Sequence, residues 1–306
     1  MPAQAVAVKE RAKKFGRLGS KAHLPYVMPT MVVMTLLIGI PIISVFVVSL
    51  TNYQLAMNLD NFQFIGLRNY ERLFFGANPI IYYSLAISLG MVVVCTAIQL
   101  VLGMASALLL NHDGIKFKGV IIACLIVPIV MTPSIASLIW KLMLNTEFGV
   151  INYFLDKLFG FSVVWLGADN ALLSVLLVSI WNYTPFVTLI MYAGLRSLPK
   201  DPYEAALIDG ASRFQVFFYV TLPMLKQLIL ITVMFRCIDM IRIFDTPFVL
   251  TQGGPGSITE FIGLFIYRTG FGVNTQVARA AAISVILLLI VSVISSLLIY
   301  AMRKKV

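Results

Sequence analysis

Charged residues are scarce in this chain. Of its 306 residues, 12% are Asp, Glu, Lys or Arg and 60% are hydrophobic. Soluble domains average about 25% charged and about 45–50% apolar residues. So little charge excludes an ordinary soluble domain, and the composition predicts an integral membrane protein.

Residues that build redox, metal or catalytic sites are also few. Cys95, Cys124 and Cys237 lie inside apolar runs without C-x-x-C spacing, so we expect them to be packing residues and not a disulfide or metal set. The two histidines, His23 and His112, are far apart in the sequence, so no metal site is expected. The chain has no G-x-x-x-x-G-K-[ST] loop, no H-E-x-x-H motif and no nucleophile elbow. We therefore expect no cofactor and no enzyme activity in this chain.

Long apolar runs are what the sequence does contain. Six of them are long enough to cross a hydrocarbon core about 30 Å thick. They cover residues 24–50, 80–110, 120–144, 172–195, 225–250 and 278–302. The predicted fold is an all-α integral membrane protein with six transmembrane helices.

The net charge of +10 is distributed unevenly between the two sides of these spans. The basic tail at residues 1–22, alternate loops and the C-terminus carry fifteen Lys and Arg residues, against four in the remaining loops. By the positive-inside rule, both termini are predicted to be cytoplasmic. The chain has no nucleic-acid-binding motif and no aromatic–basic alternation, so no nucleic-acid partner is expected.

One predicted cytoplasmic loop has a helical pattern without being a span. Residues 201–223 read D-P-Y-E-A-A-L-I-D-G-A-S-R-F-Q-V-F-F-Y-V-T-L-P. A short helix can begin there with Glu204 near its positive N-terminal end. Ala205 and Ala206 leave one face nearly flat, and Gly210 can turn the chain with a positive φ. The pattern favours a docking element for a partner, with an ordinary linker as the alternative.

This loop resembles the EAA loop of bacterial ATP-binding-cassette (ABC) importer permeases. Glu204-Ala205-Ala206 is followed after three residues by Gly210, and after nine more by Val220, one residue and Leu222-Pro223. The flanks at 181–185, 244–245 and 251–255 are similar to the carbohydrate-uptake branch of these permeases, in particular its maltose-type first subunit. The likeness covers roughly residue 80 to the C-terminus.

The resemblance implies a type I ABC importer permease fold in the bacterial cytoplasmic (inner) membrane. The charge pattern and the apolar runs divide the chain into a cytoplasmic basic tail at 1–22 and a transmembrane domain at 23–306, and the resemblance makes this a permease domain with its coupling loop at about 196–226. The implied partners are a second permease subunit, two cassette ATPase subunits, an extracytoplasmic substrate-binding protein, a sugar and membrane lipid. The residues implied in ATPase coupling are Glu204, Ala205, Ala206, Asp209, Gly210, Leu222 and Pro223.

The fifth predicted span carries Arg236, Asp239, Arg242 and Asp245. Each such residue at a helix centre costs roughly 2.5–3.5 kcal/mol on insertion scales, so these side chains are expected to face the protein interior, an aqueous cavity or each other. Opposite charges three residues apart can pair on a helix. On a continuous helix, side chains three residues apart fall about 60° short of a full turn, so Arg236 and Asp245 would end on opposite faces. Either the helix is interrupted or its far end reaches the outer interface. Internal pairing and substrate contact by Arg236 are both open.

Counted from the coupling loop, the maltose-type pattern implies a substrate path along three spans. Its positions fall on Ser134, Ser179, Asn182, Tyr183, Phe186, Arg236, Met240 and Asp245, and the neighbouring Asp239 joins them. Hydroxyl and amide groups suit sugar hydroxyls, although Asn182 and Tyr183 can equally hydrogen-bond between helices. This chain differs from the family pattern at Arg236, because the family has a residue with a small hydroxyl side chain at the equivalent sugar-contact position. A guanidinium can bind an anionic group in a bidentate manner. Our hypothesis is therefore that the transported substrate is an acidic or highly polar sugar derivative.

Two outer segments and three rival functions complete the sequence predictions. Residues 145–170 predict an amphipathic helix on the outer membrane face, a surface that in the family receives a substrate-binding protein. Residues 259–271 predict an interfacial helix. One rival is a proton-coupled secondary transporter with Asp239 and Arg236 as a relay. Another is an ABC permease for a phosphate ester or a polyamine, and an intramembrane enzyme ranks last.

Overall fold

The computed structural model describes residues 24–55, 58–76, 80–273 and 275–303. The predicted basic tail at 1–22 lies outside the described residues. Within them the chain is built from helices, and the only β pairing is an isolated bridge between Thr51 and Phe64. The prediction of an all-α fold is confirmed.

The helices follow one another in fifteen labelled segments. They are α2 (Leu24–Met34), α3 (Ile40–Ser49), α4 (Arg68–Phe75), α5 (Ile80–Asn111), α6 (Lys118–Val130), α7 (Pro133–Met143), α8 (Val150–Phe159), α9 (Ala171–Ser197), α10 (Asp201–Ile208), α11 (Arg213–Gln215), α12 (Leu222–Met224), α13 (Lys226–Ile241), α14 (Asp245–Leu250), α15 (Ile262–Phe271) and α16 (Val277–Arg303). Short π-helical turns join α2 to α3 and α11 to α12.

Four of the six predicted spans are continuous in the described part of the chain. They are Tyr26–Ser49, Ile80–Asn111, Ala171–Ser197 and Val277–Arg303, each apolar enough and long enough to cross a membrane. The other two are pairs of bent helices. α6 and α7 meet at 98°, and the segment Arg213–Met224 meets Lys226–Leu250 at 68°. The chain therefore has six crossings if each bent pair counts as one.

The span predicted at 120–144 is divided into two helices that meet at a bend, and two prolines explain why. Pro128 lies inside α6 and Pro133 begins α7. A proline lacks an N–H group and pushes the preceding residue out of the helical region. Thr132 accordingly has a ψ of 141°. The predicted span at 225–250 is also divided, because α13 ends at Ile241 and α14 begins at Asp245.

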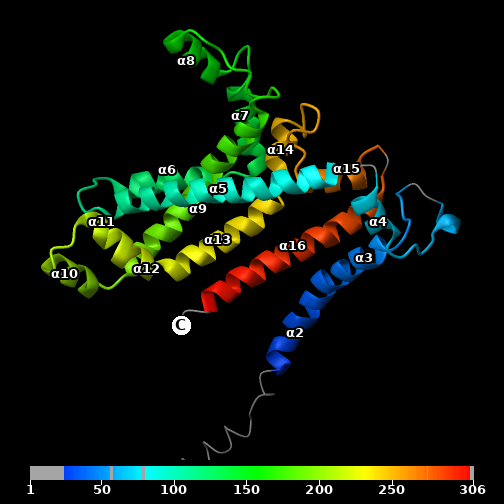
Figure 1. Cartoon of the computed structure of the whole chain (residues 1–306), viewed down its shortest axis with the longest axis horizontal. Helices are drawn as coiled ribbons and strands as arrows, with labels where there is room; N and C mark the ends of the chain where they lie inside the picture. The colour runs from blue at the N-terminus through cyan, green and yellow to red at the C-terminus, as the bar shows by residue number, and fades with distance from the viewer. Residues whose placement is uncertain (1–23, 56–57, 77–79, 274, 304–306) are drawn as a thin grey trace, which may run out of the picture.

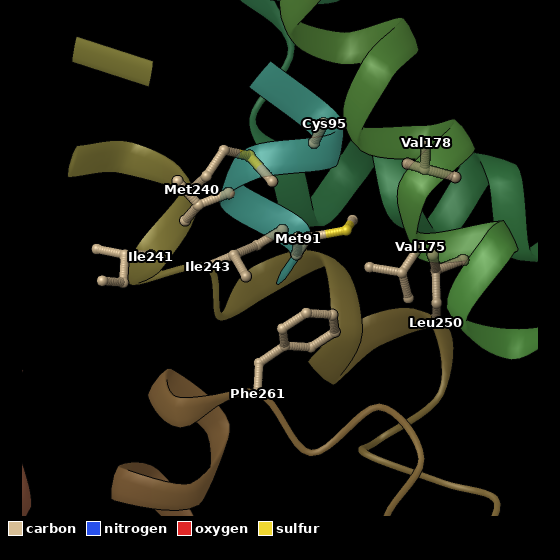
Figure 2. Close-up of a cluster of buried hydrophobic side chains, with 10 residues drawn as sticks. Met91, Cys95, Val175, Val178, Met240, Ile241, Ile243, Leu250 and Phe261 are labelled. Carbon is tan, nitrogen blue, oxygen red and sulfur yellow. The ribbon is translucent and has the colours of Figure 1, made fainter. Parts of the chain in front are cut away.

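The core lies where α5 packs on α9 and α13. Figure 2 shows one buried cluster there, with Met91 and Cys95 from α5 facing Val175 and Val178 from α9. Residues of α13, α14 and the segment before α15 close this cluster. A second cluster joins α4, α5, α15 and α16, and a third joins α5, α9 and the start of α13. Of the three cysteines, Cys95 is buried, Cys237 is partly buried, and Cys124 is exposed on α6, where we expected a packing residue.

The bundle has two distinct ends (Figure 1). One carries α10, α11, α12 and the C-terminal end of α16, and the other carries α4, α14 and α15. The predicted outer helix within 145–170 is α8, which projects away from the other helices beyond α7. The helix predicted at 259–271 is α15, and its residues Ile262, Leu264 and Phe265 are buried against the protein.

Candidate functional site

The predicted coupling loop forms two short helices joined at a glycine corner. α10 begins with Asp201 and Pro202 and ends at Ile208, and Gly210 follows with a φ of +73°. This left-handed backbone suits glycine because other residues strain there. Ser212 then caps α11 through a capping box with Gln215, so both exposed backbone N–H groups have acceptors.

This element presents an unusual amount of apolar surface. Glu204, Ala205 and Asp209 are exposed, and so is the side chain of Ile208 at 87%. Phe214 and Tyr219 add further exposed rings at 73% and 79%. Large exposed apolar patches mark interaction sites in folded proteins. The two halves of the element are linked to each other, since the Tyr203 hydroxyl of α10 donates to Thr221 Oγ1 in the π-helical turn at 3.1 Å.

Two residues of the predicted coupling set lie elsewhere on the element. Leu222 and Pro223 border an apolar groove of about 890 Å³ between α5 and α13, which Met104 and Phe217 also line. Their place is therefore at the junction of the loop with the bundle. Ala206 is half-buried beneath the exposed face that carries Glu204.

A small polar cavity lies where the two broken spans meet. Its volume is about 260 Å³, and α7, α9, α13 and α14 contribute to its walls. The lining residues are Pro133, Tyr183, Arg236, Asp239, Met240, Arg242, Ile243, Phe244, Asp245 and Thr246. Five residues of the predicted substrate path are thus brought together: Tyr183, Arg236, Asp239, Met240 and Asp245.

Arg236 is the most buried charge of this group, with 1% of its side chain exposed. Its Nε donates to Gln99 Oε1 at 2.9 Å, and its Nη1 lies 3.4 Å from Asp239 Oδ2. The guanidinium carbon lies 4.1 Å from the centre of the Tyr183 ring, within the range of a cation–π contact. The Nη2 atom is buried and has no hydrogen-bond partner among the residues that the structure describes. Arg236 is therefore held on three sides and keeps one donor available.

The remaining charges pair as a short ladder that ends at the helix break. Asp239 Oδ1 lies 3.2 Å from Arg242 Nη2. Asp245 does not continue the ladder, since it starts α14 and accepts a hydrogen bond of 2.7 Å from the Ser134 hydroxyl. The helix is therefore interrupted between Arg242 and Asp245. An interruption was one of the two arrangements that the spacing of these charges predicted.

Four residues of the predicted path are not part of the cavity lining, and one of them, Ser134, instead hydrogen-bonds the lining residue Asp245. The Ser179 hydroxyl donates to Val175 O in its own helix, and Asn182 Nδ2 donates to Pro128 O at 2.6 Å. Phe186 packs with the cluster around Met191. Asn182 of α9 thus hydrogen-bonds to α6, which is the helix–helix contact that the sequence offered as the alternative to a sugar contact.

Sequence reasoning missed Gln99, which is fully buried and connects the site to α5 and α9. It accepts from Arg236, and its Nε2 donates to the Ser179 carbonyl at 2.9 Å. Gln99 is a lone amide within the apolar run at 80–110. A polar side chain is costly within a membrane span. The position of Gln99 as a single amide among apolar residues could therefore have marked it as a buried polar contact.

The sequence matches a protein family model over residues 13–305. The family is described as the binding-protein-dependent transport system inner membrane component. The chain belongs to this family. It is therefore a permease component of a transport system in the inner membrane.

Curated relatives agree with this assignment. The permease is 37% identical over 300 residues to a probable ABC transporter permease protein of Sinorhizobium fredii, covering 98% of this chain and 94% of the relative. It is 36% identical over 251 residues to the trehalose/maltose transport system permease protein MalF of Thermococcus litoralis, covering 81% and 83%.

A solved structure shows the same fold. A chain of a bacterial alginate ABC transporter, in complex with an alginate pentasaccharide-bound periplasmic protein, aligns with the permease at a TM-score of 0.77. The alignment covers 92% of this chain and 93% of that chain at 20% identity. The permease therefore has the type I ABC importer permease fold.

Proposed function

We propose that this permease is half of the translocation pathway of a carbohydrate ABC importer, together with a second permease subunit. The trehalose/maltose relative supports the substrate class. The permease takes mechanical work at its exposed corner from two separate cassette ATPases. An extracytoplasmic binding protein delivers the sugar on the opposite side.

The coupling element is the observation that carries this proposal. A rigid corner with exposed apolar side chains and an exposed acid at position 204 suits insertion into a cleft of another protein. Because Tyr203 and Thr221 link α10 to the turn that leads through α12 into α13, we expect displacement of the corner to be transmitted to α13. Glu204 would pair with a basic group of the ATPase.

Charge reversal at Glu204 tests this coupling. Glu204→Lys places a like charge against the ATPase, so we expect about tenfold or greater loss of ATPase co-purified with the tagged permease. Asp113→Lys is the matched control, since Asp113 is an exposed acid in the loop between α5 and α6. Co-purification and ATP-driven uptake unchanged by Glu204→Lys would refute the docking role.

The cavity at the two helix breaks is the proposed substrate contact. It offers guanidinium donors and carboxylate acceptors at once, and sugar hydroxyls both donate and accept. Two arginines and two aspartates line it, so a neutral sugar and one with an anionic group both remain candidates. Tyr183 also presents a ring to the cavity and stacks on Arg236.

Arg236→Ser separates a neutral sugar from an acidic derivative. If the free Nη2 binds an anionic group, loss of the guanidinium lowers uptake of a uronate by about tenfold more than uptake of maltose. Equal losses for the two solutes would assign Arg236 to internal pairing alone. Uptake that collapses with a proton uncoupler and survives loss of the ATPase would instead favour the proton-coupled rival.

A further inference from the structure

A second polar cavity lies at the opposite end of the bundle from the coupling element. Its volume is about 340 Å³, and it is walled by α4, by the start of α16 and by the segment that follows α3. Arg72 of α4 and Arg279 of α16 both line it. The other described residues of its lining are uncharged, among them Asn52, Asn69 and Gln276. The cavity therefore holds two positive charges without a carboxylate in its wall.

Arg279 is incompletely satisfied by the protein. Its Nη1 donates to Gln276 Oε1 at 3.3 Å, a long contact, and its Nε is buried without a hydrogen-bond partner. A neighbouring cavity of about 270 Å³ shares Gln276 and Arg279 and contains Glu260. That carboxylate already lies 2.7 Å from Arg268. Buried donors in native proteins normally have partners, so Arg279 calls for an acceptor, and the exposed Arg72 beside it in the cavity wall favours an anion from outside the chain.

The surroundings of the cavity indicate a lipid as the source of that anion. Apolar side chains are exposed on the elements that wall the cavity: in the segment between α3 and α4 Phe64 is 72% exposed and Leu67 64%, and at the end of α4 Phe75 is 88% exposed. Amphipathic segments with exposed aromatic rings lie at the level of the lipid headgroups. α4 also lies apart from α7, which borders the candidate substrate cavity (Figure 1).

We propose that Arg72 and Arg279 bind the phosphate of an anionic phospholipid at the outer face of the membrane. Guanidinium groups bind phosphate oxygens in a bidentate manner, and two of them can hold both free oxygens of a phosphodiester. A headgroup such as phosphatidylglycerol adds no positive charge. The ammonium of phosphatidylethanolamine would be repelled by the same arginines. The site therefore selects the anionic lipid.

Native mass spectrometry of the assembled, detergent-solubilised transporter tests the site. Phosphatidylglycerol and phosphatidylethanolamine are added in parallel, and bound lipid is counted for each. We expect more phosphatidylglycerol on the wild type, and about tenfold weaker binding in Arg279→Gln and in Arg72→Gln, since each removes a charge-assisted contact. Arg279→Lys keeps the charge without the planar fork, and we expect an intermediate affinity.

Lys157→Gln is the matched control, because it removes one charge on α8, outside both cavities. Thermal unfolding checks that each variant is folded, and Arg72→Gln remains informative if Arg279→Gln fails to fold. Equal binding of the two lipids, or lipid binding unchanged in both arginine variants, would overturn the proposal. Displacement of the lipid by millimolar inorganic phosphate would assign the site to a free anion, and displacement by the purified binding protein would assign it to that partner.

Discussion

Gly103 of α5 lies where this helix comes close to α9. A Cβ atom at this position would lie 2.6 Å from Val187 Cγ1 and 3.1 Å from the backbone nitrogen of Thr188. The absence of a side chain therefore lets α5 and α9 approach closely, as small residues do at helix contacts in membranes. The third core cluster, around Met104 and Met191, forms directly beside this contact.

Gly103→Ala is expected to destabilise the permease by about 1–3 kcal/mol, because the added methyl group forces α5 and α9 apart. Gly90→Ala is the matched control in the same helix, since a Cβ there meets nothing within 4 Å. Alanine at position 90 should be neutral or stabilising by about 0.5–1 kcal/mol. Thermal unfolding of the solubilised transporter measures both, and equal shifts would contradict the close approach.

At the residue level, the sequence predicted which charges must be buried but not all of their partners. The cost of charge in a span required Arg236 and Asp239 to find partners, and the spacing of three predicted their pairing. Gln99 is 137 residues from Arg236. Contacts over such a separation depend on how α5 and α13 pack, which periodicity within one span does not specify.

At the scale of elements, the helix breaks are where prediction from sequence was least complete. Pro133 and Pro185 lie within two of the predicted spans, at 120–144 and 172–195. Pro133 begins a new helix after a 98° bend, while Pro185 stays inside the continuous helix α9. A proline removes one hydrogen bond wherever it occurs. Whether the helix then breaks or continues depends on the packing around it, and α9 is held by α5 along its length.

The loop between α14 and α15 is closed by an ion pair with a definite pH dependence. Burial raises the pKa of the Glu260 carboxyl, and the nearby Arg268 guanidinium lowers it. Arg268 also donates to the Gln252 carbonyl, so it fastens both ends of the loop. Because the pKa of Glu260 is raised in the folded protein, the unfolded chain loses this proton first, and stability falls as pH rises above the ordinary glutamate range near about 4.3.

Arg268→Gln removes the group that lowers this pKa, so the loss of stability between pH 4.5 and pH 7 should grow. We expect a cost of about 1–3 kcal/mol at pH 7, reduced from that of a fully buried pair because Arg268 is partly exposed. Melting temperatures at the two pH values measure it. The double variant Glu260→Gln, Arg268→Gln should lose the added pH dependence, and a dependence that persists would point to another group.

At the scale of the whole molecule, the two ends of the bundle differ in charge and in shape. The sequence predicted six crossings and both termini inside, and the described helices place α10 and the C-terminal end of α16 at one end (Figure 1). It did not predict how α2 would pack. The segment Tyr26–Ser49 has an apolar surface that the described part of the chain leaves uncovered, and a surface of this kind suits contact with lipid or with another protein.

Cysteine labelling tests this orientation. In a background with Cys95, Cys124 and Cys237 replaced, Ser212→Cys in the coupling element should react with a membrane-impermeant maleimide only when the cytoplasmic face is exposed. Ser162→Cys, in the segment that follows α8, should react only from the outside. Labelling in right-side-out and in inverted membrane vesicles shows from which face each cysteine reacts. The opposite pattern would reverse the assignment of both ends.

The interruptions of the two broken spans also determine what must fill the space between them. Thr132 and the segment from Arg242 to Phe244 lie outside regular helix within crossings of the membrane. Backbone at that depth persists only if it is buried in protein or hydrated. Mobile water next to Tyr183 and Asp245 would therefore be an integral part of the resting permease. An arriving solute would exchange its own hydroxyls for those waters one by one and would not have to shed its hydration in a single costly step.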